Sequence, residues 1–319
     1  MDNYKISHDV SIRGVLKFLP ASRSGFVSWK KKKSRNLKSE REKKKEALTA
    51  EIKKIHEDSK TIYGSPKITR ELLKKGISAS QKHVANIMRK NGWRAHYVKK
   101  YKAATTINPD FSSKLQNILD RDFNPTKPNS VWVTDITYVR TIDDGFVYLT
   151  SVMDLFSRKI IAWSLSRTLE VEGVLECIGK AKKFRQLDEA LIIHSDRGSH
   201  FVSNLYKELT KGITTSYSRK GNCWDNAVIE SFHANIKREW FSQRLPYDFN
   251  HAYRLTFEYI ETFYNTVRPH SHCDYLSPNE FERLDEEAQQ KIVSQNITAL
   301  QKREAKKKIK KSESIKISA

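Results

Sequence analysis

Apolar residues in the first third of the chain recur at every third or fourth position, which is the period of an amphipathic helix. This pattern predicts three helices, at residues 40–58, 65–76 and 80–92. The second has Ser65 as its N-cap and Pro66 at its first helical position, two residue types that favour a helix start. The second and third end at glycines, which commonly terminate helices.

The second and third predicted helices are short, are joined by a tight turn and resemble a helix-turn-helix. A recognition helix meets DNA with its outward side chains. The outward residues of the third helix are therefore the predicted DNA contacts: Gln81, Lys82, Arg89 and Lys90. An ordinary helical hairpin with a charged outer face remains the alternative, because the pattern is common.

Beyond residue 128 the pattern changes to short segments rich in β-branched and aromatic residues, separated by gaps of turn length. The first three segments predict an antiparallel meander. The predicted elements are strands 131–139, 145–153 and 159–165, a helix 170–184, a strand 190–194, a helix 203–211, a strand 213–217 and a long helix with Asp225 as its N-cap. This order is that of the ribonuclease-H-like fold. The predicted class is therefore α/β, a mixed five-stranded sheet with helices, preceded by a small helical helix-turn-helix-like domain.

These patterns divide the chain into a basic N-terminal segment (1–38), a helical DNA-binding domain (39–105), a linker (106–128), an α/β catalytic core with a C-terminal helical extension (129–285) and a basic tail (286–319). The lysine block at residues 30–33 indicates a solvated linker that serves either solubility or DNA contact. The lysine-rich stretch at residues 302–316 indicates a disordered tail that adds non-specific phosphate contacts.

The chain of 319 residues carries 59 Lys and Arg against 37 Asp and Glu, a formal net charge of +22. This balance favours a polyanionic partner, and nucleic acid is the leading one. An anionic membrane would account for the charge, but no apolar run approaches the roughly 18 residues of a spanning helix, and the start of the chain lacks a signal peptide. We therefore predict a cytoplasmic protein without a membrane partner. The three cysteines are far apart, which suggests neither a disulfide framework nor a Cys-x-x-Cys zinc site.

Three acidic residues occupy positions where a catalytic site would be expected. Asp135 lies mid-strand among valines, and a buried carboxylate costs several kcal/mol unless it is paired or binds a metal. Asp196 follows a predicted strand, at the end of an α/β sheet where sites usually form. Glu230 lies in the last predicted helix, and Lys237, seven residues on, shares its face. Any one of these acids alone would more often be a solvated surface residue. The prediction therefore depends on all three acids occurring together.

Three carboxylates from separate elements supply the oxygen ligands that hard divalent cations prefer. Two such ions, roughly 3.5–4 Å apart, stabilise both the attacking and the leaving oxygen of an in-line displacement at phosphorus. No Ser-His-Asp, Gly-x-Ser-x-Gly or Walker sequence offers a different chemistry. The sequence therefore predicts metal-dependent phosphoryl transfer in which the nucleophile is water or a bound hydroxyl.

The chain resembles a known family, the two-frame bacterial insertion-sequence transposases, whose downstream product, OrfB, carries an integrase core of the retroviral-integrase superfamily. The resemblance covers nearly the whole chain. It rests on the motifs at residues 22–25, 63–68, 132–138, 194–199, 218–227 and 230–232, and on Tyr264, Asn265, Arg268, His270, Ser277 and Pro278. Together these motifs are far more specific than any acidic triad.

The resemblance implies two Mg²⁺ ions, with Mn²⁺ as a substitute, bound by a catalytic DDE triad of Asp135, Asp196 and Glu230. Asp135 would bridge both ions, and Lys237 stands where the family has a basic residue. The family exposes a 3′-hydroxyl at an element end by hydrolysis and then uses it to attack another phosphodiester, which is DNA integration. The implied partners are double-stranded DNA at element ends and target, further copies in a homo-oligomer on DNA, and an upstream OrfA product or OrfAB fusion.

Two departures from the family pattern stand out. The segment between Asp196 and Glu230 contains 33 residues, two fewer than is usual in the family. Residues 272–274, His-Cys-Asp, replace small residues that typically end in glycine. With His270 they look superficially like zinc ligands, but no second cluster is within reach in the sequence, so a zinc site is disfavoured.

Two other functions remain open at this stage. One is a non-catalytic DNA-binding regulator with a decayed integrase core, against which the intact acids and flanking motifs argue. The other is a metal-dependent nuclease, which would share the metal chemistry but stop after hydrolysis.

Overall fold

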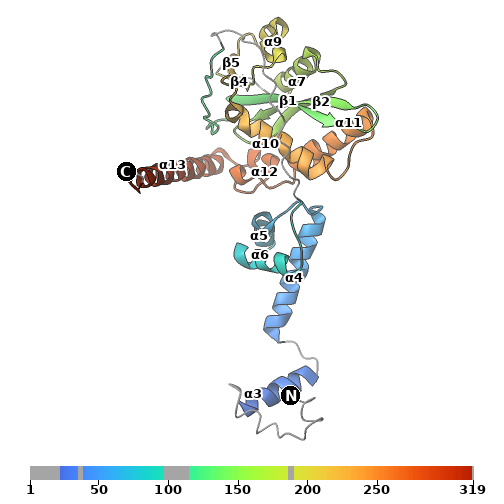
Figure 1. Ribbon diagram of the computed structural model, residues 1–319, viewed down its shortest axis with the longest axis vertical. Coiled ribbons are helices and arrows are strands. Elements are labelled where there is room, and N and C mark those ends of the chain that lie inside the picture. The colour runs from blue at the N-terminus through green and yellow to red at the C-terminus, as the bar shows by residue number, and fades with distance from the viewer. Residues whose placement is uncertain (1–21, 35–38, 97–114, 186–189, 318–319) are drawn as a thin grey trace. The chain divides into compact units, whose positions relative to one another are not determined.

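The computed structural model describes residues 22–34, 39–96, 115–185 and 190–317. Contacts divide the chain into two compact units, Met1–Ala95 and His96–Ala319 (Figure 1). The described part of the first unit is helical, and the second unit is built on a β-sheet. The predicted domain boundary at residues 105 and 106 lies outside the described residues.

The helices of the first unit are α3 (Arg23–Ser34), α4 (Glu40–Asp58), α5 (Ser65–Lys74) and α6 (Gln81–Lys90). The last three confirm the three predicted helices. The predicted N-cap of the second was wrong, because Gly64 is the N-cap of α5 and Ser65 is its first residue. Ser39 and Glu42 form a capping box at the start of α4, and the Ser80 hydroxyl accepts the His83 N–H at the start of α6. The pattern of apolar residues builds the core of this unit, in which four side chains are fully buried: Ile52, Ile68, Leu72 and Val84.

The lysine block at residues 30–33 lies within α3, so its prediction as a linker was wrong. A run of charge indicates solvation, but it does not by itself end a helix. Lysine has a high helix propensity, and neither Gly nor Pro interrupts residues 26–34.

The sheet of the second unit confirms the predicted mixed, ribonuclease-H-like arrangement. Its strands are β1 (Val131–Arg140), β2 (Phe146–Asp154), β3 (Ile160–Ser166), β4 (Ile192–Ser195) and β5 (Thr214–Tyr217). Their spatial order is β3-β2-β1-β4-β5. The first three strands pair antiparallel as a meander, whereas β4 pairs parallel with both β1 and β5.

Helices cover both faces of this sheet (Figure 1). On one face, α7 (Val171–Phe184) packs against β2 and β3, around a core that includes Trp132, Val152 and Phe201. Because side chains alternate along a strand, Asp135 belongs to the face opposite Trp132. That second face is covered by α10 (Ala227–Ile236), which contacts β1. The two short helices between β4 and β5 are α8 (Ser199–Val202) and α9 (Asn204–Leu209).

The described part of the predicted linker, residues 115–128, packs against the outer strand β5. The backbone N–H groups of Ile118 and Leu119 both donate to the Ser216 hydroxyl, at 2.9 and 3.0 Å. The Tyr217 N–H donates to the Gln116 carbonyl at 2.9 Å. This segment therefore belongs to the core and brings its own side chains close to the chain that precedes α10.

The C-terminal part is helical. Its elements are η1 (Cys223–Asn226), which leads into α10, then η2 (Lys237–Phe241), α11 (Phe249–Phe257), η3 (Glu258–Tyr264), η4 (Ser271–Cys273), α12 (Pro278–Glu282) and α13 (Glu286–Ile317). The prediction of a disordered tail was wrong, because α13 runs through it. The tail lacks Gly and Pro and is rich in Lys, Glu, Gln and Ala, which favour helix. Val293 anchors the start of α13 in a cluster with Phe156 and Phe281.

A buried ion pair joins the segment after α10 to the end of the core. The Arg268 guanidinium donates to both carboxylate oxygens of Glu239, at 2.7 and 2.6 Å, and the Tyr259 hydroxyl donates to one of them at 2.8 Å. Arg268 is 8% and Glu239 6% exposed by side chain. Because neither side chain is solvated, the charge of each must be compensated by the other.

The unusual residues at 272–274 have a structural counterpart. Asp274 and Tyr275 adopt left-handed backbone conformations, with φ of 48° and 64°. Such a conformation costs residues other than glycine roughly 1–2 kcal/mol, although Asp tolerates it better than most. A glycine, the residue usual in the family, is therefore what this backbone favours at the turn, and Asp274 is a tolerable substitute.

We expect Arg268→Met to lower the free energy of unfolding by about 3–5 kcal/mol, because it removes the guanidinium that donates to both oxygens of the buried Glu239 carboxylate. Urea unfolding followed by circular dichroism measures the change. The matched control is Lys211→Met, since Lys211 pairs with Glu208 at 3.8 Å with both side chains about 80% exposed. That variant should unfold like the wild type. Equal stability of Arg268→Met and the control would show that the buried pair contributes no more than a surface pair.

Candidate active site

Asp135 lies in the middle of β1, opposite Ser151 of β2. Its side chain is 18% exposed, and one carboxylate oxygen lies 3.4 Å from Nδ1 of His233, in α10. His233 is itself buried, and its Nε2 lies 3.3 Å from the Ser151 hydroxyl. The sheet and α10 therefore hold Asp135 between them. The sequence pattern carried no signal for His233, because its neighbour Asp135 comes from a distant strand.

Asp196 directly follows β4 and is exposed. One of its carboxylate oxygens accepts the Gly198 N–H at 2.9 Å. A Cβ atom at residue 198 would lie 3.0 Å from this oxygen, so a larger residue here would crowd the Asp196 carboxylate. Desolvation by the surrounding protein, followed by the negative charge of Asp135, raises the pKa of Asp196 to about 6.

Glu230 lies in the first turn of α10. It keeps surface open to solvent, yet partial desolvation raises the pKa of its carboxyl to about 7, and the charges of Asp135 and Asp196 add to this rise. The three predicted acids therefore lie close enough to repel one another. The fold brings them together from β1, from the end of β4 and from α10.

Lys237 lies just after α10, as the first residue of η2. Burial lowers the pKa of its ammonium, and the negative charge of Asp135 opposes that change. Its positive charge therefore interacts with the negative charge of Asp135. The buried side of the same helical run is formed by Ile229, Phe232, Ile236 and Trp240.

The three acids fit a divalent cation by the chemistry of their donors. They offer carboxylate oxygens, which hard cations prefer, and a cation would relieve their mutual repulsion. Among the described residues, no three His, Cys, Asp or Glu side chains form a ready-made group of metal ligands.

The His272–Cys273 pair is occupied by protein contacts. His272 bonds through Nε2 with the Phe156 carbonyl at 3.0 Å, and burial lowers its pKa to about 3. The Cys273 thiol donates to the Ser157 carbonyl at 3.2 Å, and burial raises its pKa to about 12. A zinc ligand is a thiolate, whereas Cys273 is held as a thiol. The zinc alternative thus finds no support in these contacts.

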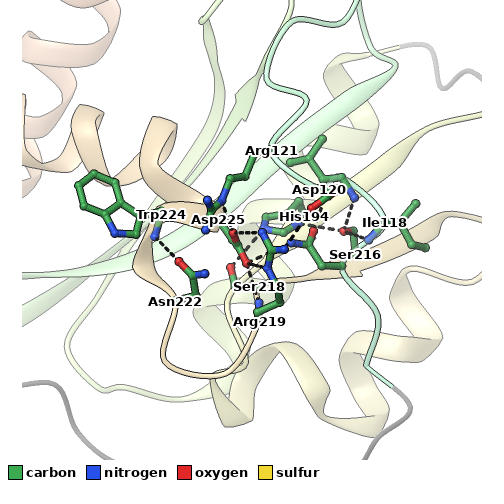
Figure 2. Close-up of polar contacts among 12 residues, drawn as sticks. Ile118, Asp120, Arg121, His194, Ser216, Ser218, Arg219, Asn222, Trp224 and Asp225 are labelled. Carbon is green, nitrogen blue, oxygen red and sulfur yellow. Dashed lines mark hydrogen bonds and ion pairs between the residues drawn. The ribbon is translucent and has the colours of Figure 1, made fainter. Parts of the chain in front are cut away.

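Asp225 does not cap the helix, so that prediction was wrong. Asn222 caps η1 instead, since its side-chain oxygen accepts the Trp224 N–H at 3.3 Å (Figure 2). The Asp225 carboxylate is fully buried and accepts from the guanidinium of Arg219 at 2.8 and 2.9 Å and from Nε of Arg121 at 2.6 Å. These bonds hold the pKa of Asp225 far below its usual range.

The buried Asp225 fixes the loop that leads into α10. It ties residues 218–222 to the segment before β1, from which Asn117 also donates at 3.0 Å. The next residue, Asn226, donates to the Thr134 carbonyl at 3.1 Å, beside Asp135. The position of Glu230 is therefore set by contacts of Asn226 and Asp225, four and five residues before it.

His194 lies nearby at the end of β4 but is a structural residue. It is fully buried, and its two ring nitrogens bond with the hydroxyls of Ser216 and Ser218 at 2.9 and 3.2 Å (Figure 2). Burial lowers its pKa to about 4, so the ring is neutral at pH 7. It links β4 to β5 and to the loop that follows.

The four predicted DNA contacts in the first unit, Gln81, Lys82, Arg89 and Lys90, are all exposed on α6. The structure adds neighbours that the sequence pattern did not single out. Asn86 accepts from Arg89 at 3.1 Å, and a groove of about 640 Å³ runs between α6 and the basic residues of α4. Its polar lining includes Arg41, Lys44, Lys45, His83, Asn86 and Lys90.

The mixed sheet, with acids from β1, β4 and α10, defines an integrase core. The integrase core domain family matches residues 125–223, a second integrase core domain family matches residues 211–278, and an HTH-like domain family matches residues 43–101. In the described residues no helix is long and apolar enough to cross a membrane.

Sequence relatives extend the match over most of the chain. The transposase for insertion sequence element IS904 of Lactococcus lactis subsp. lactis (strain IL1403) is 36% identical over 243 residues, 76% of this chain and 95% of that protein. Transposase InsF for insertion sequence IS3A of Escherichia coli (strain K12) is 33% identical over 276 residues, 86% of this chain and 94% of that protein. The chain belongs to the family of insertion-sequence transposases.

Solved structures show a more distant likeness. A simian T-cell lymphotropic virus intasome in complex with PP2A regulatory subunit B56 gamma aligns with a TM-score of 0.42 and 17% identity, over 73% of this chain and 75% of that one. The HTLV-2 integrase catalytic core domain in complex with magnesium aligns with a TM-score of 0.37 and 15% identity, over 48% of this chain and 96% of that one. No conclusion about function follows from similarities this distant.

The pKa values of Asp196 and Glu230 predict a pH-dependent response to magnesium. Both carboxyls have a higher pKa in the folded than in the unfolded chain, so without metal the stability falls as pH rises from about 4 through 7. A bound cation would favour the ionised carboxylates and oppose this loss. Mg²⁺ should therefore raise the melting temperature more at pH 8 than at pH 5, as thermal unfolding at each pH would measure. The double variant Asp196→Asn, Glu230→Gln is the control and should lose this difference, and an equal Mg²⁺ effect at both pH values in the wild type would contradict the prediction.

Proposed function

We propose that this protein is a DNA transposase that catalyses metal-dependent strand cleavage and strand transfer of an insertion sequence. The observation that carries the proposal is the position of the three acids: Asp135 on β1, Asp196 directly after β4 and Glu230 in the first turn of α10. Desolvation, and then the charge of Asp135, raise the pKa values of the other two. Membership of the transposase family supports the same reaction.

Asp135, Asp196 and Glu230 would act as the DDE triad and hold two Mg²⁺ ions, with Mn²⁺ as a substitute. Bound there, the ions would neutralise charge on the attacking and leaving oxygens. The protein's own residues prepare this arrangement. His233 and the sheet orient Asp135, and the Gly198 N–H orients Asp196.

Lys237 would bind a phosphate oxygen of the DNA beside the acids. Its partly buried ammonium is compensated by Asp135, and a phosphate would add a second negative partner. A contact of this kind positions the strand but carries no sequence information. In the first step of the reaction, water would hydrolyse one phosphodiester and expose a 3′-hydroxyl. In the second step, that hydroxyl would attack another phosphodiester.

The partners that follow are double-stranded DNA at element ends and target, further copies of this chain on that DNA, and an upstream OrfA product or OrfAB fusion. The net charge of +22 supports the DNA partner. The regulator with a decayed core is disfavoured, because the contacts that orient Asp135 and Asp196 are intact. A nuclease would share this site and is distinguished by the absence of joined products.

Each of Asp135→Asn, Asp196→Asn and Glu230→Gln should abolish both cleavage and joining of element-end DNA, because the three acids would form one metal site. The assay separates cleaved from joined products on a denaturing gel. DNA affinity and melting temperature, measured alongside, should stay close to those of the wild type. Near-normal joining in any variant would remove that residue from the site, and cleavage without joining in the wild type would favour the nuclease.

The helical unit should bind DNA independently of catalysis, through the outward side chains of α6. Element-end and scrambled duplexes are compared across salt concentrations for the wild type and for the triple variant Gln81→Ala, Lys82→Ala, Arg89→Ala. Phosphate contacts weaken steeply with salt, whereas base contacts persist as a preference between sequences. We expect the wild type to prefer the element end and the variant to lose that preference. If neither protein distinguishes the duplexes, the unit only binds phosphates or is structural, and end recognition belongs to the upstream partner.

A further inference from the structure

Trp224 presents 69% of its surface to solvent, on the η1 turn directly before the helix that carries Glu230. A tryptophan side chain offers about 150–250 Å² of area to a binding partner. An indole this exposed gains little from the fold itself. It is placed instead to meet something outside the chain.

The backbone under this ring is held rigidly. The Trp224 N–H donates to the Asn222 side chain at 3.3 Å, and the next residue, Asp225, is anchored by the buried ion pairs with Arg219 and Arg121. Figure 2 shows the indole directed away from this cluster. Binding through a ring whose backbone is already fixed loses less conformational entropy than binding through a mobile loop.

The ring also lies within reach of the reacting strand. Trp224 lies in η1, and Glu230 lies six residues further on, in the first turn of α10. At about 1.5–2 Å per residue their Cα atoms lie roughly 10 Å apart. Successive nucleotides of one strand follow at about 3.4 Å. The separation of Trp224 and Glu230 therefore corresponds to about three nucleotides of a single strand.

We propose that Trp224 stacks on an unpaired nucleobase within about three nucleotides of the phosphate at the active site, an inference that rests on the proposed function. Every base has a π-face, so one tryptophan accepts bases of any sequence. Arg219, on the same loop, and Arg121, on the segment before β1, have side chains that are 47% and 41% exposed. Both add positive charge for the backbone of that strand. In an intact duplex the neighbouring pairs cover the base faces, so Trp224 selects DNA that is frayed, gapped or distorted at the reacting position.

The test compares two gapped duplexes in fluorescence anisotropy with the full-length protein in EDTA, where binding is separated from cleavage. One exposes a short run of unpaired thymines in the gap, and the other carries abasic nucleotides at those positions. The phosphates are identical, so phosphate binding contributes equally to both. The wild type should bind the thymine duplex about tenfold more tightly, a difference of about 1.4 kcal/mol.

Trp224→Ala should abolish this preference, whereas Trp224→Phe, which keeps an aromatic face, should retain most of it. Phe184→Ala removes an aromatic side chain that is 77% exposed at the end of α7, and this matched control should keep the wild-type preference. Melting temperatures of all variants should match the wild type, because neither ring is packed in the core. Retention of the thymine preference by Trp224→Ala, or its equal loss in Phe184→Ala, would overturn the proposal.

A separate measurement tests the proposed function. A wild-type protein that prefers the thymine duplex but neither cleaves nor joins DNA in Mg²⁺ would count against transposase chemistry and still support stacking. An active enzyme without the preference would overturn stacking alone. A change in oligomeric state on Trp224→Ala, with the base preference intact, would assign the ring to a protein contact.

Discussion

Mutual repulsion among Asp135, Asp196 and Glu230 is the constraint on which the rest of this structure depends. Like charges favour separation, and this repulsion adds to desolvation, the larger cause, in raising the pKa values of Asp196 and Glu230. The fold therefore needs enough independent stability to keep them close when no cation compensates their charge. It supplies that stability by placing one acid mid-strand, one at a strand end and one on a helix packed across the sheet.

The contacts around α10 show how that helix is kept in place. Asp225 and Asn226 fix its start to the segment before β1 and to β1 itself, and the buried pair of Glu239 and Arg268 fixes the turn after it. Its position thus depends on both ends. Side chains held on rigid elements in this way keep the geometry that transfer of a phosphoryl group requires, which mobile loops do not.

Much of this was predictable from local patterns. The alternation around Asp135 placed this acid on a strand, and the apolar run before Asp196 placed that acid at a strand end. The apolar spacing after residue 226 placed Glu230 on a helix. The role of Asp225 was not predictable, because its partners Arg121 and Asn117 lie 104 and 108 residues away. His233 was missed for the same reason. The helical structure of the basic segments at 30–33 and 302–316 was not predicted. A run of charge indicates that a segment is solvated, whereas helix formation depends on helix propensity and on the absence of Gly and Pro.

The long sequence separation of the Asp225 partners also bears on the order in which the chain folds. Contacts between residues about a hundred positions apart form late. Closing so long a loop costs conformational entropy before the contact contributes any favourable free energy. The β1–β2–β3 meander needs only short loops and can form early. We therefore expect a newly synthesised chain to acquire its sheet first and the anchored start of α10 last. An integrase core built in this order would complete its acidic site only when folding is nearly finished.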